Sequence, residues 1–237
     1  SKYRKDALYN AARSQENLQQ YDAAAKTFAR YAQLYPEAED AARTQFHAAR
    51  IYEKTREYGR EIQALRDFDR RFARTKEPEL LVQARLRMGL AYKELGQDQA
   101  ARREFAAAVA EFGRRGLKPE SNPAAAAAAA EAQFRLAEYE YEKYDRITLP
   151  ATANARKLKG ALEAKLRELK KVAPLYNEVK RYKRPDWTLA AFYRQAYLLE
   201  RLAQTLYDAP VPPEFKRPGQ AEYLAAYQDR LAQFAQP

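Results

Sequence analysis

The segment Tyr21-Asp-Ala-Ala-Ala-Lys-Thr-Phe28 decides the fold, because the chain repeats its pattern twice more. The pattern recurs as Tyr58-Gly-Arg-Glu-Ile-Gln-Ala-Leu65 and again as Asp98-Gln-Ala-Ala-Arg-Arg-Glu-Phe105. The apolar residues that close the three segments are 37 and 40 residues apart. A period of this length is the signature of stacked supersecondary units. Each unit is expected to hold two helices, one ending before a turn and one beginning at the quoted segment.

Apolar residues recur at helical spacing around these segments. In the range 79–95, residues spaced by three and four are Leu81, Ala84, Met88, Ala91, Tyr92 and Leu95. Breakers such as Pro36, Pro78 and Gly96 fall between the periodic stretches, and strand-like alternation is absent. The sequence therefore predicts an all-α chain, an α-solenoid of antiparallel helix pairs.

Composition excludes several classes of protein. The 237 residues include no cysteine and one histidine, which excludes disulfide scaffolds, thiolate metal sites and cysteine nucleophiles. No apolar run approaches the roughly 18 residues of a transmembrane segment. Neither of the phosphate-binding glycine motifs, GxxxxGK[ST] or GxGxxG, occurs. We expect a protein that is not an enzyme, with no catalytic residues, no metal and no cofactor.

The repeat pattern degrades after residue 143. A long helix is expected over about 153–182, with a kink or a break at Pro174, and further helices follow Asp186 and the proline-rich range 210–218. The chain is thus divided into helical repeats over 1–145 and a divergent helical extension over 146–237, which is expected to pack on the solenoid.

The third unit resembles the tetratricopeptide repeat, a helix-turn-helix unit of about 34 residues. Met88-Gly89, Tyr92, Ala101 and Phe105 stand where that family has Leu-Gly, Tyr, Ala and Phe. The resemblance covers residues 5–145 and implies a right-handed superhelix. It also implies a close approach of two helices at Gly89, beside Ala101.

Two positions depart from this family pattern. The second unit has Glu61 where the family has its helix-packing alanine, and the first has Gln15 where the family has tyrosine. These units are therefore expected to be irregular, although their spacing survives.

A narrower resemblance concerns the string YxxAxxxFxxYxxxYP from Tyr21 to Pro36. It is similar to bacterial envelope members of the family, such as the lipoprotein of the outer-membrane β-barrel assembly machine and the periplasmic partner of the Tol-Pal system. The order Trp187, Ala190-Ala191 and Tyr193-Arg194 resembles tetratricopeptide proteins of the gliding-motility machinery. These resemblances imply a periplasmic or envelope-associated protein, with the cytoplasm as the alternative. Because helical periodicity starts within a few residues of Ser1, the chain is expected to be a fragment of a longer protein.

In this family the inner faces of the first helices line a concave groove that holds a peptide or a partner segment. Carried over to this chain, the partner-binding groove would include Tyr9, Arg13, Arg43, Phe46, His47, Arg50, Gln83, Leu86, Leu90, Lys93, Phe134, Glu138 and Tyr141. Arginine grips carboxylates bidentately and aromatic rings supply apolar contact area, so an acidic or C-terminal peptide segment is expected. The alternative for each residue is packing between helices or simple solvation.

Positive charge is concentrated in the range 155–184. Seven Lys and four Arg stand there against three Glu, a net of +8 out of +11 for the chain. A basic ridge is expected, made of Lys165, Lys170, Lys171, Lys180, Arg181, Lys183 and Arg184. Part of this charge suits a helix C-terminus, and the rest could face an acidic protein, an anionic membrane surface or nucleic acid.

The sequence thus predicts a non-catalytic adaptor or scaffold that assembles a bacterial cell-envelope complex, with gliding motility as one such setting. The alternative is a nucleic-acid-binding helical repeat protein, favoured by the pI of 9.6. An ordered series of base-reading polar pairs is missing, and most tyrosines lie on apolar stripes. Specific nucleic-acid binding is therefore not expected.

Overall fold

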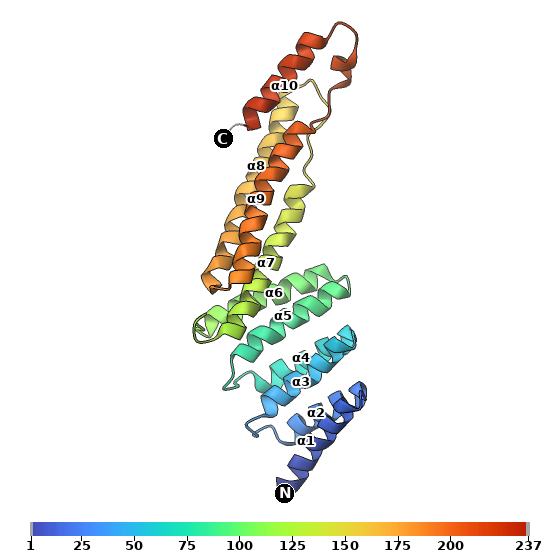
Figure 1. Ribbon diagram of the computed structural model, residues 1–237, viewed down its shortest axis with the longest axis vertical. Helices are drawn as coiled ribbons and strands as arrows, with labels where there is room; N and C mark the ends of the chain where they lie inside the picture. The colour runs from blue at the N-terminus through green and yellow to red at the C-terminus, as the bar shows by residue number, and fades with distance from the viewer. Residues whose placement is uncertain (1, 236–237) are drawn as a thin grey trace. The chain divides into compact units, whose positions relative to one another are not determined.

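The computed structural model describes residues 2–235, which are built of helices joined by short connections and contain no strand (Figure 1). The α-helices are α1 (Lys2–Asn17), α2 (Tyr21–Leu34), α3 (Ala41–Lys54), α4 (Tyr58–Phe72), α5 (Glu79–Glu94), α6 (Asp98–Arg114), α7 (Pro123–Asp145), α8 (Ala155–Asn177), α9 (Pro185–Tyr207) and α10 (Ala221–Ala235). Two short 3-10 helices, η1 (Glu178–Tyr182) and η2 (Pro213–Lys216), follow α8 and α9. The predicted all-α chain of helix-turn-helix repeats is confirmed.

The chain divides into two compact units, 1–132 and 133–237. Helix α7 contributes its first half to unit 1 and its second half to unit 2. The boundary expected after residue 145 lies at the end of this helix, 13 residues further along the chain than the boundary between the two units.

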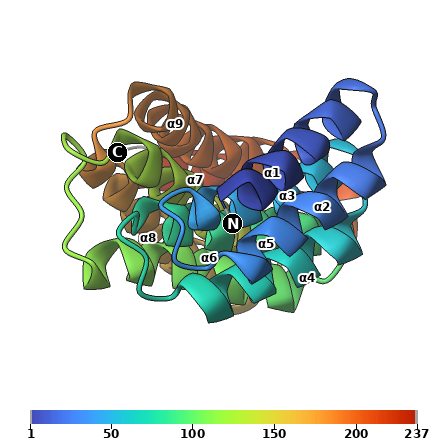
Figure 2. The ribbon, with the colours of Figure 1, turned by 90° about the horizontal axis from the view of Figure 1, so that it is seen from below.

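Unit 1 stacks its helices in chain order. Helices α1 and α2, α3 and α4, and α5 and α6 form antiparallel pairs, and α2 and α4 also pack against the next pair. In Figure 2, α1 and α3 lie on one side of the stack, and α2 and α4 lie on the other. The repeat anchors Phe28, Leu65 and Phe105 are at most 1% exposed, as their apolar periodicity predicts.

The turn inside each pair has the same backbone geometry. Its central residue is Gln19, Arg56 or Gly96, and each has a positive φ, of 59°, 59° and 69°. In the third turn the amide of Gly96 donates to the carbonyl of Lys93, and the next amide donates to the carbonyl of Tyr92. The other two turns repeat this pair of hydrogen bonds, which is the left-handed termination that glycine favours. The repeats therefore share a turn that only the third builds with glycine.

Gly89 lies at a close approach between the two helices of the third pair. A Cβ atom at this position would lie 2.5 Å from Cδ1 and Cε1 of Phe105. The expected close approach is present, and the three nearest atoms to that Cβ position all belong to the ring of Phe105. Ala101 is itself fully buried one turn earlier on α6.

Unit 2 contains α8, α9 and α10 together with the second half of α7. Its core cluster includes Leu158 and Leu162 of α8, Leu206 of α9 and Leu231 of α10. Pro174 lies in the last turn of α8, and the chain continues as η1 after Asn177, so the long helix expected over 153–182 changes type near its end.

Candidate partner-binding groove

A groove opens on the first helices of the repeats in unit 1. It has a volume of about 460 Å³ and is lined by Tyr9, Phe28, Asp40, Arg43, Thr44, Phe46, His47, Arg50, Leu80 and Gln83. Tyr9 comes from α1, the range 43–50 from α3, and Gln83 from α5. The structure thus brings together six of the residues expected in the groove: Tyr9, Arg43, Phe46, His47, Arg50 and Gln83.

Aromatic rings build the floor of this groove. The Phe28 ring meets the His47 ring edge-on at 5.0 Å between centroids, and it meets the Tyr9 ring at 5.7 Å. Tyr9 also packs edge-on against Tyr31 at 5.6 Å. Phe28 is only 1% exposed, so the rings of Tyr9 and His47 help to enclose it at the base of the groove.

His47 is held by a hydrogen bond to α1. Its Nε2 lies 3.0 Å and 3.1 Å from the two carboxylate oxygens of Glu16. Arg13, also expected in the groove, is exposed and pairs with the same Glu16 at 3.4 Å. This arrangement makes His47 a link between the first and second repeats.

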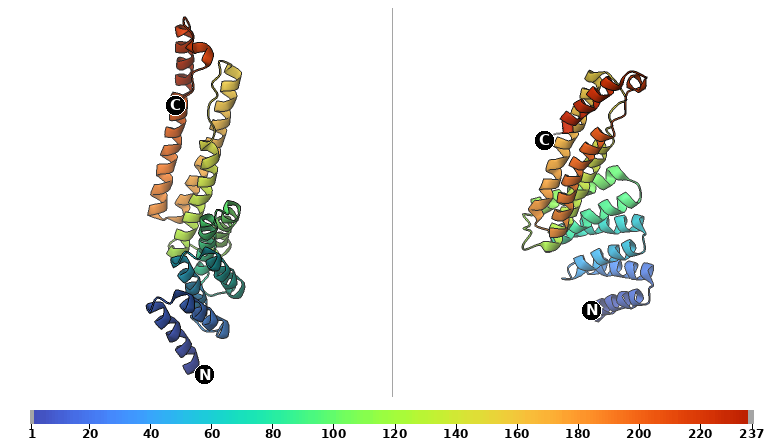
Figure 3. Two further views of the ribbon diagram at one scale, coloured as in Figure 1. Left: turned by 90° about the vertical axis from the view of Figure 1, so that its right-hand side faces the viewer. Right: turned by 45° about the horizontal axis from the view of Figure 1, so that its top comes forward.

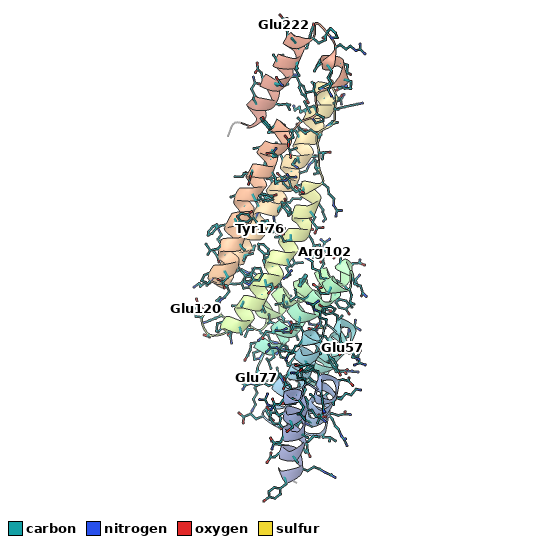
Figure 4. The ribbon with its side chains drawn as sticks, turned by 45° about the vertical axis from the view of Figure 1, so that its right-hand side comes forward. Glu57, Glu77, Arg102, Glu120, Tyr176 and Glu222 are labelled. Atoms are coloured by element: carbon teal, nitrogen blue, oxygen red, sulfur yellow. The ribbon has the colours of Figure 1, made fainter. Side chains whose placement is uncertain are left out.

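Two arginines of α3 lie at the groove, and they differ in whether an acidic side chain of the chain pairs with them. Arg43 pairs with Glu77, which lies in the loop before α5 and is labelled in Figure 4. Arg50 is exposed and forms no ion pair within residues 2–235. An incoming carboxylate can therefore bind Arg50 without displacing an acidic side chain of the chain itself.

An acidic residue also borders the groove, but it is already engaged. The hydroxyl of Tyr31 donates to Oδ1 of Asp40 at 2.6 Å. Burial of Tyr31 and its contact with Asp40 raise the pKa of the tyrosine hydroxyl, so it stays protonated and keeps donating. This hydrogen bond stabilises the carboxylate of Asp40 at the edge of the groove.

Three expected residues of α5 do not line this groove. Leu86 is buried at 8% exposure, Leu90 is half-buried and Lys93 is exposed near the end of the helix. The groove uses the first turns of α5, where Leu80 and Gln83 lie, because that end of the helix meets α3 at this face. Leu86, Leu90 and Lys93 are therefore not among the residues that line this opening, and a role for them in partner binding stays a prediction.

The three expected residues of α7 belong to the interior contacts of unit 2. Phe134 packs against Tyr176 and Trp187, with ring centroids 5.5 Å and 5.3 Å apart. Glu138 accepts hydrogen bonds from Tyr176, labelled in Figure 4, and from Arg194. Packing by α8 and α9 uses the face of α7 that carries Phe134 and Glu138, and neither residue lines the opening formed by α1, α3 and α5.

Tyr141 is the third of these residues. It is 8% exposed, its ring lies 6.1 Å from that of Tyr197, and the Arg194 guanidinium lies 4.7 Å from its centroid. Burial raises the pKa of its hydroxyl to about 12. It is therefore also a packing residue of unit 2.

Four groove residues escaped prediction: Phe28, Asp40, Thr44 and Leu80. Asp40 and Thr44 precede His47 at helical spacing, so the pattern of α3 alone could have revealed them. Phe28 was assigned to the core as a repeat anchor, and it serves both as core and as floor.

One residue expected on the basic ridge, Lys165, is buried. Lys165 is 1% exposed, and its ammonium donates to the carbonyls of Ile147 at 2.8 Å and Tyr144 at 3.3 Å. Burial lowers the pKa of this lysine. Lys165 was wrongly placed on the ridge, because it binds the carbonyls at the C-terminal end of α7.

The other ridge lysines and arginines reach solvent to different degrees. Lys170, Lys171, Lys180, Arg181 and Lys183 are exposed, and Arg184 is half-buried. Lys171 pairs with Glu168 at 2.5 Å, and Arg181 pairs with Glu178 at 3.1 Å.

Comparisons with known proteins agree with the repeat architecture. The segments 6–38 and 83–113 match the family model "Tetratricopeptide repeat". These segments cover much of the first and third helix pairs, whereas the second pair, which carries Glu61, lies outside both. No curated protein matches the chain.

Two solved structures show a weak likeness to the chain. One is a putative kinesin light chain of Podosopora anserina with nearly identical TPR-like repeats, at 17% identity and a TM-score of 0.45, covering 98% of this chain and 97% of that chain. A point variant of that same protein has 16% identity and a TM-score of 0.42, covering 97% of this chain and 93% of that chain. At these values the likeness says nothing about what the chain binds.

No helix within 2–235 is long and apolar enough to cross a membrane. No group of three His, Asp or Glu residues in that range could hold a metal ion.

Helical repeat stacks of this kind present extended concave surfaces and are typically protein-binding scaffolds.

Proposed function

We propose that this protein is a non-catalytic scaffold whose unit 1 groove captures an acidic or C-terminal segment of a partner protein. The observation that carries the proposal is the meeting of three first helices around one opening, with Arg50 exposed at it and Phe28 at its floor. An acidic or C-terminal peptide can place its carboxylate on Arg50 and an apolar side chain on the aromatic floor. The groove volume of about 460 Å³ lies in the range of specific ligand sites.

The test of the groove uses Arg50. Arg50→Glu should weaken binding of a fluorescently labelled acidic peptide with a free C-terminus by at least about tenfold, because an attractive contact becomes a repulsive one. Fluorescence anisotropy measures the affinity. The matched control is Arg103→Glu, which changes an equally exposed arginine on α6 outside the groove.

Two results would contradict this assignment. Equal affinity of the Arg50→Glu and Arg103→Glu variants would place the peptide site elsewhere. Undiminished binding of an amidated, uncharged version of the peptide would remove the role of the carboxylate.

The proposed setting is a cell-envelope complex in the periplasm, with gliding motility as one candidate. Its support is the residue pattern from Tyr21 to Pro36 and the order of residues around Trp187. Protease accessibility in spheroplasts of the source bacterium tests the compartment. A protein protected until the inner membrane is broken would instead be cytoplasmic.

A second candidate function, binding of polyanions, is favoured by the net charge of +8 over 155–184. An anionic membrane surface, an acidic protein and nucleic acid share this chemistry. We propose weak, sequence-independent attraction to such surfaces as an accessory to protein binding.

A further inference from the structure

Helix α9 exposes an apolar face that the rest of unit 2 does not cover. Its members are Leu189, Phe192, Tyr193, Ala196, Leu199 and Ala203, all of which are exposed. The exposed fractions of Leu189, Tyr193 and Leu199 reach 60–66%. We call this set the α9 apolar face. By contrast, the neighbouring α8 exposes mainly Lys, Arg and Glu, as a solvated helix does.

The spacing of this face is that of a helix-packing seam. Leu189, Phe192, Ala196, Leu199 and Ala203 follow each other at alternating intervals of three and four. Such a seam accepts the ridges of another helix. From Leu189 to Tyr207 it extends roughly 27 Å at 1.5 Å per residue.

The face continues into an apolar cavity beside α10. The cavity has a volume of about 560 Å³ and is bordered by Ala203 and Tyr207 of α9 and by Tyr227 and Leu231 of α10. Figure 3 shows α8 and α9 side by side, with α10 near the C-terminal end of α9. An occupant of the face can therefore insert a side chain next to Ala203.

We infer that the occupant is the α9 helix of a second copy of this chain, packed antiparallel about Ala196. In that register Leu189 of one copy lies over Ala203 of the other, so a large side chain meets a small one beside the cavity. Tyr193 lies over Leu199, and Ala196 meets itself. The small residue at the centre lets the two helices approach closely.

Charge also favours this register. Glu200 is the only ionic side chain on the exposed face between Leu189 and Tyr207. It falls opposite Phe192 of the second copy, and Nζ of Lys180 lies 5.1 Å from the centroid of that ring. Glu200 of each copy therefore lies next to Lys180 of the other. A partner without a cation there would leave Glu200 desolvated and unpaired.

Association is expected to be moderate. A dimer that buries one helix face and the cavity beside it has an interface area at the lower end of the range for specific complexes. A dimer that forms at micromolar concentration is the expected state.

Sedimentation velocity tests the dimer. The wild-type chain should dimerise between about 1 and 100 µM, and Ala196→Glu, which places two carboxylates against each other, should weaken association by at least about tenfold. Leu95→Glu, at a 44% exposed leucine of unit 1, is the matched control and should leave the dimer intact. A wild-type monomer over the whole range would overturn the proposal and leave the face to a different protein.

A charge exchange tests the pairing of Lys180 with Glu200. Lys180→Glu and Glu200→Lys should each weaken the dimer several-fold, and the double variant should regain most of the affinity. Failure of the double variant to recover would overturn the antiparallel register.

The absence of cysteine from the sequence permits a direct test of register. Ala196→Cys should form a covalent dimer under mild oxidation, since a disulfide requires Cα atoms within about 7 Å. Ala203→Cys should not link to itself but should link to Leu189→Cys in a mixture. Crosslinking of Ala203→Cys alone, or none at Ala196→Cys, would contradict the register, and circular dichroism checks that each variant is folded.

Discussion

At the scale of single residues, Glu61 is an acidic residue buried at a helix-packing position of the second repeat. It stands where the other repeats have a small residue, and it is only 2% exposed. Burial, reinforced by the nearby carboxylate of Glu53 and opposed by Arg87, raises its pKa to about 8. The folded chain therefore keeps Glu61 protonated at neutral pH, whereas the unfolded chain releases that proton near pH 4.5.

This difference predicts a pH dependence with a definite sign. The folded pKa lies above the unfolded one, so the stability contribution is complete below about pH 4.5 and is lost as the pH rises toward 8. At 1.36 kcal/mol per pH unit, the loss between pH 4.5 and pH 7 is roughly 3 kcal/mol. Glu61→Gln, which carries no titrating proton, should therefore be more stable than wild type at pH 7 by up to that amount.

Urea unfolding at pH 5, 7 and 8 measures this effect. The gain from Glu61→Gln should be small at pH 5 and should grow toward pH 8. Glu94→Gln changes an exposed carboxylate and serves as the control. A gain from Glu61→Gln that does not change with pH would show that Glu61 is not protonated in the folded chain.

At the scale of helices, the contact between α5 and α6 depends on the missing side chain of Gly89. Gly89→Ala places a Cβ atom 2.5 Å from the buried Phe105 ring, so the ring or the helix must shift. We expect a loss of about 1–3 kcal/mol in the free energy of unfolding. Gly59→Ala in α4 is the matched control, because no atom lies within 4 Å of its Cβ position.

The control should change stability in the opposite direction. Alanine in a helix is favoured over glycine by up to about 1 kcal/mol, so Gly59→Ala should raise the midpoint of thermal unfolding. Equal effects of the two substitutions would mean that the close approach at Gly89 is absent in solution.

Two substitutions in the turns inside the repeats are expected to have opposite effects on the stability of the chain. Gly96→Ala forces an L-residue to a φ of 69° and should destabilise by about 1 kcal/mol. Arg56→Gly relieves the same strain at a φ of 59° and should be neutral or stabilising. Chemical denaturation measures both, and a stabilising Gly96→Ala would contradict the shared turn geometry.

At the scale of the whole molecule, the uneven charge predicts salt-dependent binding of polyanions. With about four phosphate contacts, affinity for duplex DNA should fall roughly 100-fold between 50 and 200 mM salt, without sequence preference. Replacing Lys170, Lys171 and Arg181 by glutamate should reduce binding at low salt. The control replaces Arg30, Arg71 and Arg103, which are exposed in unit 1.

Titration of labelled DNA and single-stranded RNA at about 150 mM salt, where the Debye length is about 8 Å, decides between the two functions. Weak binding to every sequence would agree with a protein-binding scaffold. Tight binding that discriminates between sequences would favour the nucleic-acid-binding alternative instead.

Local information determined the repeats. The spacing of Phe28, Leu65 and Phe105 is the length of one helix-turn-helix repeat, and each of the three residues is buried as the repeat predicts. The resemblance to the tetratricopeptide repeat implied the close approach at Gly89, and the structure shows that the ring of Phe105 lies there. The groove residues of α3 came from the resemblance to the tetratricopeptide repeat, and the structure brings Arg43, Phe46, His47 and Arg50 to one opening.

Only the tertiary structure decided which polar or charged residues are buried and which apolar residues remain exposed. Lys165 belongs to a basic stretch, yet contacts with α7 bury it and bind its ammonium. Phe134 and Glu138 face α8 and α9, which return to α7 from more than 30 residues away in sequence. Leu189 and Leu199 carry a core-like pattern but stay exposed, because α9 has two apolar sides and unit 2 covers one. Helical periodicity identifies a face that can be buried, and the packing partner, supplied by distant parts of the chain, determines whether it is.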